Sequence, residues 1–162
     1  MKAMALVACL VMAAAAVAQA GGSEGQVFRC STSAEVHSAL KRAGPGDSIL
    51  LEGGKVYEIE KRFKLRGKGT ENNPIRFTSL DPSGQGRYAV ITTVGQKKEP
   101  DLTAIQLTGS YWVVSRIEIS GARVPLPGGF WDTNGFLLGL YLHGAASHHN
   151  IIEDVHIHHT HN

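Results

Sequence analysis

The stretch LTGSYWVVSRIEIS at Leu107–Ser120 decides the fold, because it recurs further along the chain. The second copy begins as LHG at Leu142–Gly144 and, after a short insertion, continues as SHHNIIEDVHIH at Ser147–His158. In each copy, turn residues precede an alternation of apolar and polar residues, which is typical of strands with one buried face. The aligned apolar pairs are Val114 with Ile152, Ile117 with Val155, and Ile119 with Ile157. Such a repeat predicts a parallel β-helix, whose coils stack like residues about 4.8 Å apart.

The turn residues favour a parallel β-helix over an antiparallel sandwich. Asp154 stands at the corner between the two strands of one copy, and Asp tolerates the left-handed backbone of such a corner better than its counterpart Arg116 does. Sandwich hairpins would be closed by tight Asn-Gly or Asp-Gly turns, whereas Asn134-Gly135 stands in a long loop with Pro and Gly. The β-helix is therefore favoured, and the sandwich stays the alternative.

One helix precedes the strands. Thr32 and Glu35 have the spacing of a capping box, apolar residues follow at helical spacing, and Gly44-Pro45-Gly46 ends the segment. Because the first coil of a solenoid has an open apolar end, we expect this helix, residues 32–43, to cover it. The β-rich runs that follow are Ser48–Leu51, Lys55–Ile59, Arg62–Leu65, Ile75–Ser79, Ala89–Val94, Ala104–Leu107, Trp112–Ser120, Phe136–His143 and Asn150–His158.

Length and composition exclude several classes of protein. A chain of 162 residues allows one ordinary domain, and 43% hydrophobic with 19% charged residues excludes a disordered tail and a membrane bundle. The formal charge of +2 is too small to indicate a nucleic-acid or anionic-membrane partner. We predict neither partner.

The amino end has the pattern of a secretory signal peptide. Lys2 precedes the apolar run Ala3–Ala18, and Ala18-Gln19-Ala20 supplies a small-x-small cleavage site. We therefore expect a secreted, extracellular protein with a signal peptide at residues 1–20, an N-terminal segment at 21–31 and the N-terminal part of a β-helix domain at 32–162. The mature chain then carries the single Cys30, which is either buried and inert or paired with a cysteine outside this chain.

Several segments resemble one family of proteins. They are Ala43–Leu51 with Gly54 and Tyr57, Gly69–Ile75, and Gly109–Val114. Together they resemble the amino-terminal part of pectin-lyase-like, right-handed parallel β-helix proteins, in the branch of chondroitinase-B-type and alginate lyases. The resemblance covers nearly all of the mature chain, and its motifs describe a cap, corners and stacking positions rather than chemistry.

The resemblance implies a function. Members of the branch cleave acidic polysaccharides by β-elimination, in some cases with calcium, and their basic catalytic residues lie on coils beyond those of this chain. We therefore expect a secreted polysaccharide-lyase-like protein that acts on acidic, uronate-containing polysaccharide, with catalytic residues unknown. No cofactor is evident, and any calcium would take its ligands from outside this chain. The alternative is a non-catalytic β-helix module that binds glycans or builds an extracellular surface.

The chain is also expected to be truncated at its carboxyl end. The second copy of the repeat is followed only by His159-Thr160-His161-Asn162, which leaves nothing to cover Val155 and Ile157.

Three cations form the first candidate site. Arg62, Lys64 and Arg66 alternate with apolar residues, so they share one strand face and could bind a polyanion. The alternative is a solvated outer face balanced by Glu58 and Glu60.

Histidines form the second candidate site. His156 and His158 share a strand face, and Glu118 occupies the position that matches His156 one coil below. A Glu118–His156 contact could be a general base with its orienting carboxylate or part of a transition-metal site. The alternative is a polar, solvated face of the solenoid.

The loop from Ala122 to Gly135 interrupts the repeat. It carries Phe130 and Trp131, and aromatic rings such as Trp131 could stack on sugars. Alternatively, these rings fold back and cover the solenoid.

Overall fold

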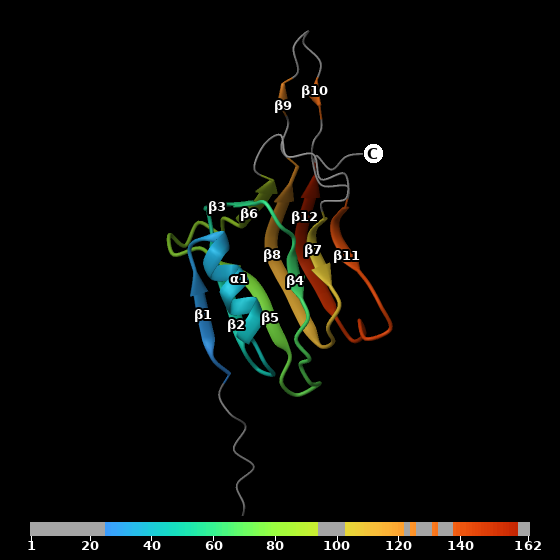
Figure 1. Cartoon of the computed structure of the whole chain (residues 1–162). Coiled ribbons are helices and arrows are strands. Elements are labelled where there is room, and N and C mark those ends of the chain that lie inside the picture. Colours follow the sequence, from blue (N-terminus) through green and yellow to red (C-terminus); the bar gives the residue numbers. More distant parts are fainter. Residues whose placement is uncertain (1–24, 94–102, 122–123, 126–130, 133–137, 159–162) are drawn as a thin grey trace, which may run out of the picture.

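The computed structural model describes residues 25–93, 103–121, 124–125, 131–132 and 138–158 (Figure 1). The predicted signal peptide lies outside these residues. The elements are β1 Val27–Cys30, α1 Ser33–Arg42, β2 Ser48–Glu52, β3 Val56–Ile59, β4 Phe63–Leu65, β5 Ile75–Leu80, β6 Ala89–Thr93, β7 Thr103–Leu107, β8 Trp112–Ser120, β9 Val124–Pro125, β10 Trp131–Asp132, β11 Leu138–Leu142 and β12 Ile151–His158.

The strands coil around a common interior as a parallel β-helix. The first coil is formed by β2, β3 and β4, the second by β5, β6 and β7, the third by β8 and β11, and β12 begins a fourth. Strands of successive coils pair in parallel along three faces, which we call the first, second and third sheets. The first contains β1, β2, β5 and the first halves of β8 and β12, and the second contains β3, β6 and the second halves of β8 and β12, through which the two are joined. The third contains β4, β7 and β11. The fold predicted from the repeat is confirmed, and the sandwich is not the fold.

The repeat has the predicted register. Ile152, Val155 and Ile157 of β12 lie opposite Val114, Ile117 and Ile119 of β8, respectively. Between the halves of these strands, the backbone turns at Arg116 and Asp154, whose φ angles are 55° and 53°. This left-handed region carries a steric cost for L-residues, and Asp bears it more easily than Arg. The corner thus bends one long strand from the first sheet into the second.

Apolar side chains fill the interior coil by coil. The largest fully buried side chains are Trp112, Tyr57, Phe63 and Phe77. The hydroxyl of Tyr57 donates to the carbonyl of Cys30 at 2.6 Å and accepts from the amide of Glu52 at 2.7 Å. The one polar atom of this buried ring is therefore satisfied, as burial requires.

Helix α1 closes the amino end of this interior. Thr32 and Glu35 form the predicted capping box, and the helix contacts β1, β2, β3 and β4. Its inward residues, Val36, Ala39 and Leu40, belong to the same apolar core as the first coil. The expected capping helix is present, with its last helical residue at Arg42.

Two features of the strands were not predicted. Strand β1 lies in the segment at 21–31 and pairs with β2, so the first sheet begins one strand earlier than expected. Strands β9 and β10 form a short antiparallel pair inside the loop from Ala122 to Gly135. At the last coil, the apolar side chains of Ile151, Ile152 and Ile157 are exposed.

Cys30 is buried, with 4% of its surface exposed. Burial raises the pKa of its thiol to about 11, with Glu35 nearby adding to the effect. The reactive thiolate is therefore disfavoured, as in an inert buried cysteine.

None of the helices in the described ranges has the length and apolar character needed to span a bilayer.

The cap can be tested by placing a charge beneath it. Val36 is fully buried between α1 and the first coil, so Val36→Asp is expected to lower the free energy of unfolding by about 3 kcal/mol or more in urea titrations. Ser38→Asp, on the exposed side of the same helix, should change it by no more than about 0.5 kcal/mol. Equal stability of Val36→Asp and wild type would contradict the capping role.

Candidate functional site

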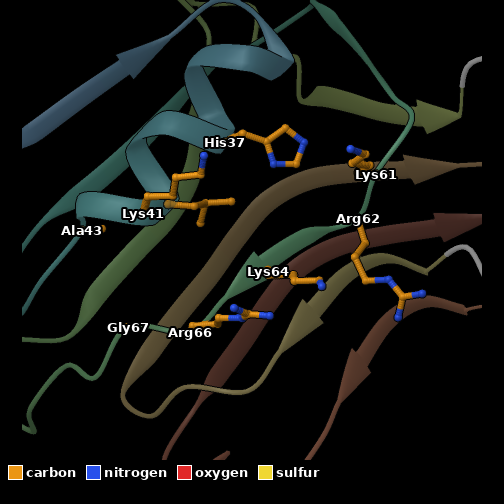
Figure 2. Close-up of a pocket in the computed structure, with 9 residues that line it drawn as sticks. His37, Lys41, Ala43, Lys61, Arg62, Lys64, Arg66 and Gly67 are labelled. Atoms are coloured by element: carbon orange, nitrogen blue, oxygen red, sulfur yellow. The ribbon is translucent and has the colours of Figure 1, made fainter.

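A groove of about 780 Å³ lies where α1 meets β4 and the segment leading into it (Figure 2). Five of its lining side chains are Lys or Arg, one is His, and no carboxylate is among them. The lining residues are His37, Leu40, Lys41, Ala43, Lys61, Arg62, Lys64, Arg66 and Gly67. We call this feature the cationic groove. Its composition suits an anion that several positive charges contact together.

Strand β4 supplies one wall of the groove through its alternation. Phe63 and Leu65 are fully buried in the core, so Lys64 between them must point outward. The predicted cations Arg62, Lys64 and Arg66 all line the cationic groove. Glu58 and Glu60, which the alternative interpretation set against them, are exposed but are not among the lining residues.

Helix α1 supplies the other wall. His37 and Lys41 are one helical turn apart, and both line the groove opposite Lys64 of β4 and the following Arg66; the ring of His37 points from the helix toward Lys61 (Figure 2). The ring of His37 lies edge-on against Phe63, with 4.9 Å between centroids. Sequence reasoning missed His37, Lys41 and Lys61 as site residues. The basic last turn of the helix was a signal for Lys41.

The cations of the groove affect the titration of His37. Partial burial lowers the pKa of this imidazole, and the positive charges of Lys41 and Lys61 lower it further. His37 is therefore neutral at pH 7, while the Lys and Arg side chains around it are charged. The cationic groove is a region of positive potential, which disfavours a further proton on His37.

The outer face of the third sheet continues from the cationic groove. Lys64 of β4 lies opposite Gln106 of β7, and Gln106 lies opposite Tyr141 of β11. Two strand spacings, about 10 Å, therefore separate Lys64 from Tyr141 along this outward row. The groove and the exposed Tyr141 belong to one continuous face.

Tyr141 is paired with His143 on that face. The phenol oxygen lies 3.0 Å from His143 Nδ1, and the two rings stack with 5.3 Å between centroids. The tyrosine is 37% exposed. Such a pair offers a flat surface for a sugar ring and a group that can move a proton. Sequence reasoning missed it, although residues two apart on a strand share a face.

Trp131, the aromatic residue predicted to stack on sugars, lies in β10. Its side chain falls outside the described residues. Its predicted role therefore stays a prediction.

The His-rich face differs in one contact from the expected arrangement. Glu118 and His156 lie in register on β8 and β12, as predicted. The Glu118 carboxylate, however, lies 2.8 Å from Nε2 of His158. His156 instead packs edge-on against Tyr88, whose hydroxyl donates to Asp154 at 2.5 Å. Glu118 therefore pairs diagonally, because the ring of His156 is engaged by the tyrosine.

The donors needed for a metal ion do not come together in the described ranges. No group of three or more His, Cys, Asp or Glu side chains there could hold a metal ion. The cationic groove, with no carboxylate in its lining, is equally unsuited to a cation.

Comparisons with known proteins agree with the fold. No family model and no curated protein sequence matches this chain. The solved alginate lyase from Paenibacillus sp. str. FPU-7 superposes with a TM-score of 0.62 at 25% identity, over 82% of this chain and 36% of that enzyme. A mutant of the PL6 family alginate lyase AlyGC aligns with a TM-score of 0.45 at 25% identity, over 62% of this chain and 12% of that one.

The likeness to the Paenibacillus enzyme supports a polysaccharide-lyase-like parallel β-helix. This chain spans little more than a third of the length of the Paenibacillus enzyme. The narrower assignment to one branch of the pectin-lyase-like proteins stays a prediction.

The Glu118–His158 pair is expected to contribute little to stability. Both side chains are partly solvated, with 31% and 40% of their surfaces exposed, and exposed ion pairs typically contribute less than about 1 kcal/mol. Glu118→Gln should therefore lower the free energy of unfolding by less than about 1 kcal/mol in urea titrations at pH 6. A loss above about 2 kcal/mol would show that the His-rich face is a structural element rather than a solvated surface.

Proposed function

We propose that this β-helix protein binds acidic, uronate-containing polysaccharide across the outer face of its third sheet, with the cationic groove holding the carboxylates. The observation that carries the proposal is the lining of that groove, which gathers five Lys and Arg side chains and no carboxylate. A polymer with a charge on each sugar can contact several of these cations at once. Multiple weak contacts of this kind add up along one chain.

A polysaccharide fits better than other polyanions. The whole chain has a formal charge of only +2, which is too small to indicate a nucleic-acid partner. The groove leads to the Tyr141–His143 pair, whose rings offer a stacking surface for a sugar. The structural likeness to an alginate lyase points to the same class of ligand. Such a ligand is extracellular, in keeping with the predicted signal peptide.

A second candidate function is cleavage of the bound polymer by β-elimination. The reaction needs a cation at the uronate carboxylate and a base that takes the proton from C5. As that bond breaks, its electron pair forms the C4–C5 double bond, and the glycosidic oxygen leaves C4 and takes up a proton. We propose Lys64 or Arg66 for the carboxylate and Tyr141, hydrogen-bonded to His143, for the proton transfers, because Lys64 and Tyr141 share one face and Arg66 lines the adjoining groove.

Binding can be tested by reversing one charge in the groove. Lys64→Glu should weaken the affinity for a fluorescently labelled alginate oligosaccharide at least about tenfold at low ionic strength, because attraction becomes repulsion. Fluorescence anisotropy measures this affinity. Added salt should weaken wild-type binding through screening.

Arg76→Glu is the matched control for this experiment. Arg76 is exposed on the first sheet, outside the groove, and its substitution changes the net charge by the same amount. Its affinity should stay within about threefold of wild type, since nearby charges outweigh distant ones under screening. Equal losses of affinity for Lys64→Glu and Arg76→Glu would show that binding depends on the net charge of the protein and not on the cationic groove.

Cleavage has its own test. Tyr141→Phe keeps the aromatic ring and removes the hydroxyl group that would transfer the proton. Oligosaccharide binding should therefore persist, while the release of unsaturated uronate falls about 100-fold or more. The ultraviolet absorbance of the unsaturated uronate measures this release. Unchanged cleavage by Tyr141→Phe would eliminate this tyrosine as the acid or base. Wild-type protein that binds without cleaving would be the non-catalytic glycan-binding module.

A further inference from the structure

We propose that His37 is part of the anion-binding site and that the cationic groove takes up a proton on His37 together with its ligand. This inference rests on the proposed function, since it describes how the same groove responds to an acidic polymer. It adds His37 to the cations predicted from the sequence. It also makes the groove a receptor whose own charge changes when it is occupied.

The position of His37 carries the argument. The imidazole lines the groove and is intermediate in exposure, so a ligand can approach it. Its ring packs edge-on against Phe63, which is fully buried and gives it a fixed surface to rest on. An anion that enters the groove between α1 and β4 therefore meets this imidazole at close range (Figure 2).

The groups that face His37 come from both walls. Lys41 lies one turn further along α1, and Lys61, Arg62 and Lys64 come from β4 and the residues leading into it. These neighbours are cationic, and the groove lining contains no carboxylate. A hydrogen bond with the backbone of Lys61 favours the protonated ring, but burial and the two nearby lysines act more strongly in the other direction.

An anionic ligand reverses this balance. In the empty groove, the lowered pKa of His37 keeps the ring neutral near pH 7. Carboxylates bound beside it offset the lysine charges and favour the imidazolium, so the pKa of His37 rises when the ligand binds. By linkage, binding then takes up a proton, and the affinity increases as the pH falls from the bound pKa toward the free pKa.

The size of the effect has an upper bound. One protonation site can strengthen binding by at most about tenfold for each unit by which the ligand raises the pKa of His37. We expect a several-fold increase in affinity between pH 7.5 and pH 5.5. Uronate carboxylates stay ionised over this range, so the ligand itself contributes no change of charge.

The experiment measures affinity against pH for wild type, His37→Gln and His156→Gln. Gln keeps a polar side chain at each position but does not titrate. His156 is exposed on the second sheet and serves as the matched control, because its loss removes an imidazole outside the groove. The probe is the labelled alginate oligosaccharide at fixed ionic strength. Calorimetry in two buffers of different ionisation enthalpy counts the protons taken up.

The expected result is a several-fold increase in affinity at lower pH, with proton uptake, for wild type and His156→Gln, and a flat profile for His37→Gln. A wild-type profile that persists in His37→Gln would overturn the inference and assign the proton to another group. Affinity independent of pH in the wild type would overturn it as well, while leaving the binding function intact. No binding at any pH, with all variants folded by circular dichroism, would instead remove the proposed function.

Discussion

The structure depends on the pairing of each strand with its equivalent one coil further along the chain. This pairing fixes which residues stack, so apolar residues of every coil must fall on the same inward positions and polar residues on the same outward ones. The left-handed corners at Arg116 and Asp154 keep that register by bending β8 and β12 at the same place. A surface feature on one coil is consequently continued by the next coil, as in the row from Lys64 through Gln106 to Tyr141.

The cationic groove arises where this repetition stops at the amino end of the solenoid. Among the described residues, no further strand pairs with β4 on that side, and α1 lies there instead, so a helix wall meets a strand wall. The edge of β4 that a further strand would have paired faces the helix instead. The position of the groove thus follows from the need to close an apolar interior, and its charge follows from residues on both closing elements.

Features that depend on residues within one helix or strand could be predicted from the sequence, whereas features that depend on the packing of two elements could not. The repeat fixed β8 and β12, and the capping box fixed the start of α1, because each signal lies in a short stretch of chain. Alternation along one strand likewise placed Arg62, Lys64 and Arg66 on one face. His37 and Lys41 could not be placed beside them, since the packing of α1 on β4 is set by tertiary contacts. The diagonal pairing of Glu118 was missed because it depends on where Tyr88 lies.

The bond between Tyr88 and Asp154 has a consequence for how the solenoid loses its structure. Tyr88 precedes a strand of the second coil and Asp154 lies in the fourth, with the guanidinium of Arg116, in the third, 5.8 Å from the tyrosine ring. In a simple repeat protein, each unit contacts only its neighbours, so the outermost unit can fray alone. A side chain that reaches past its neighbour couples units two apart. It makes the detachment of β12 more cooperative with the coils beneath it.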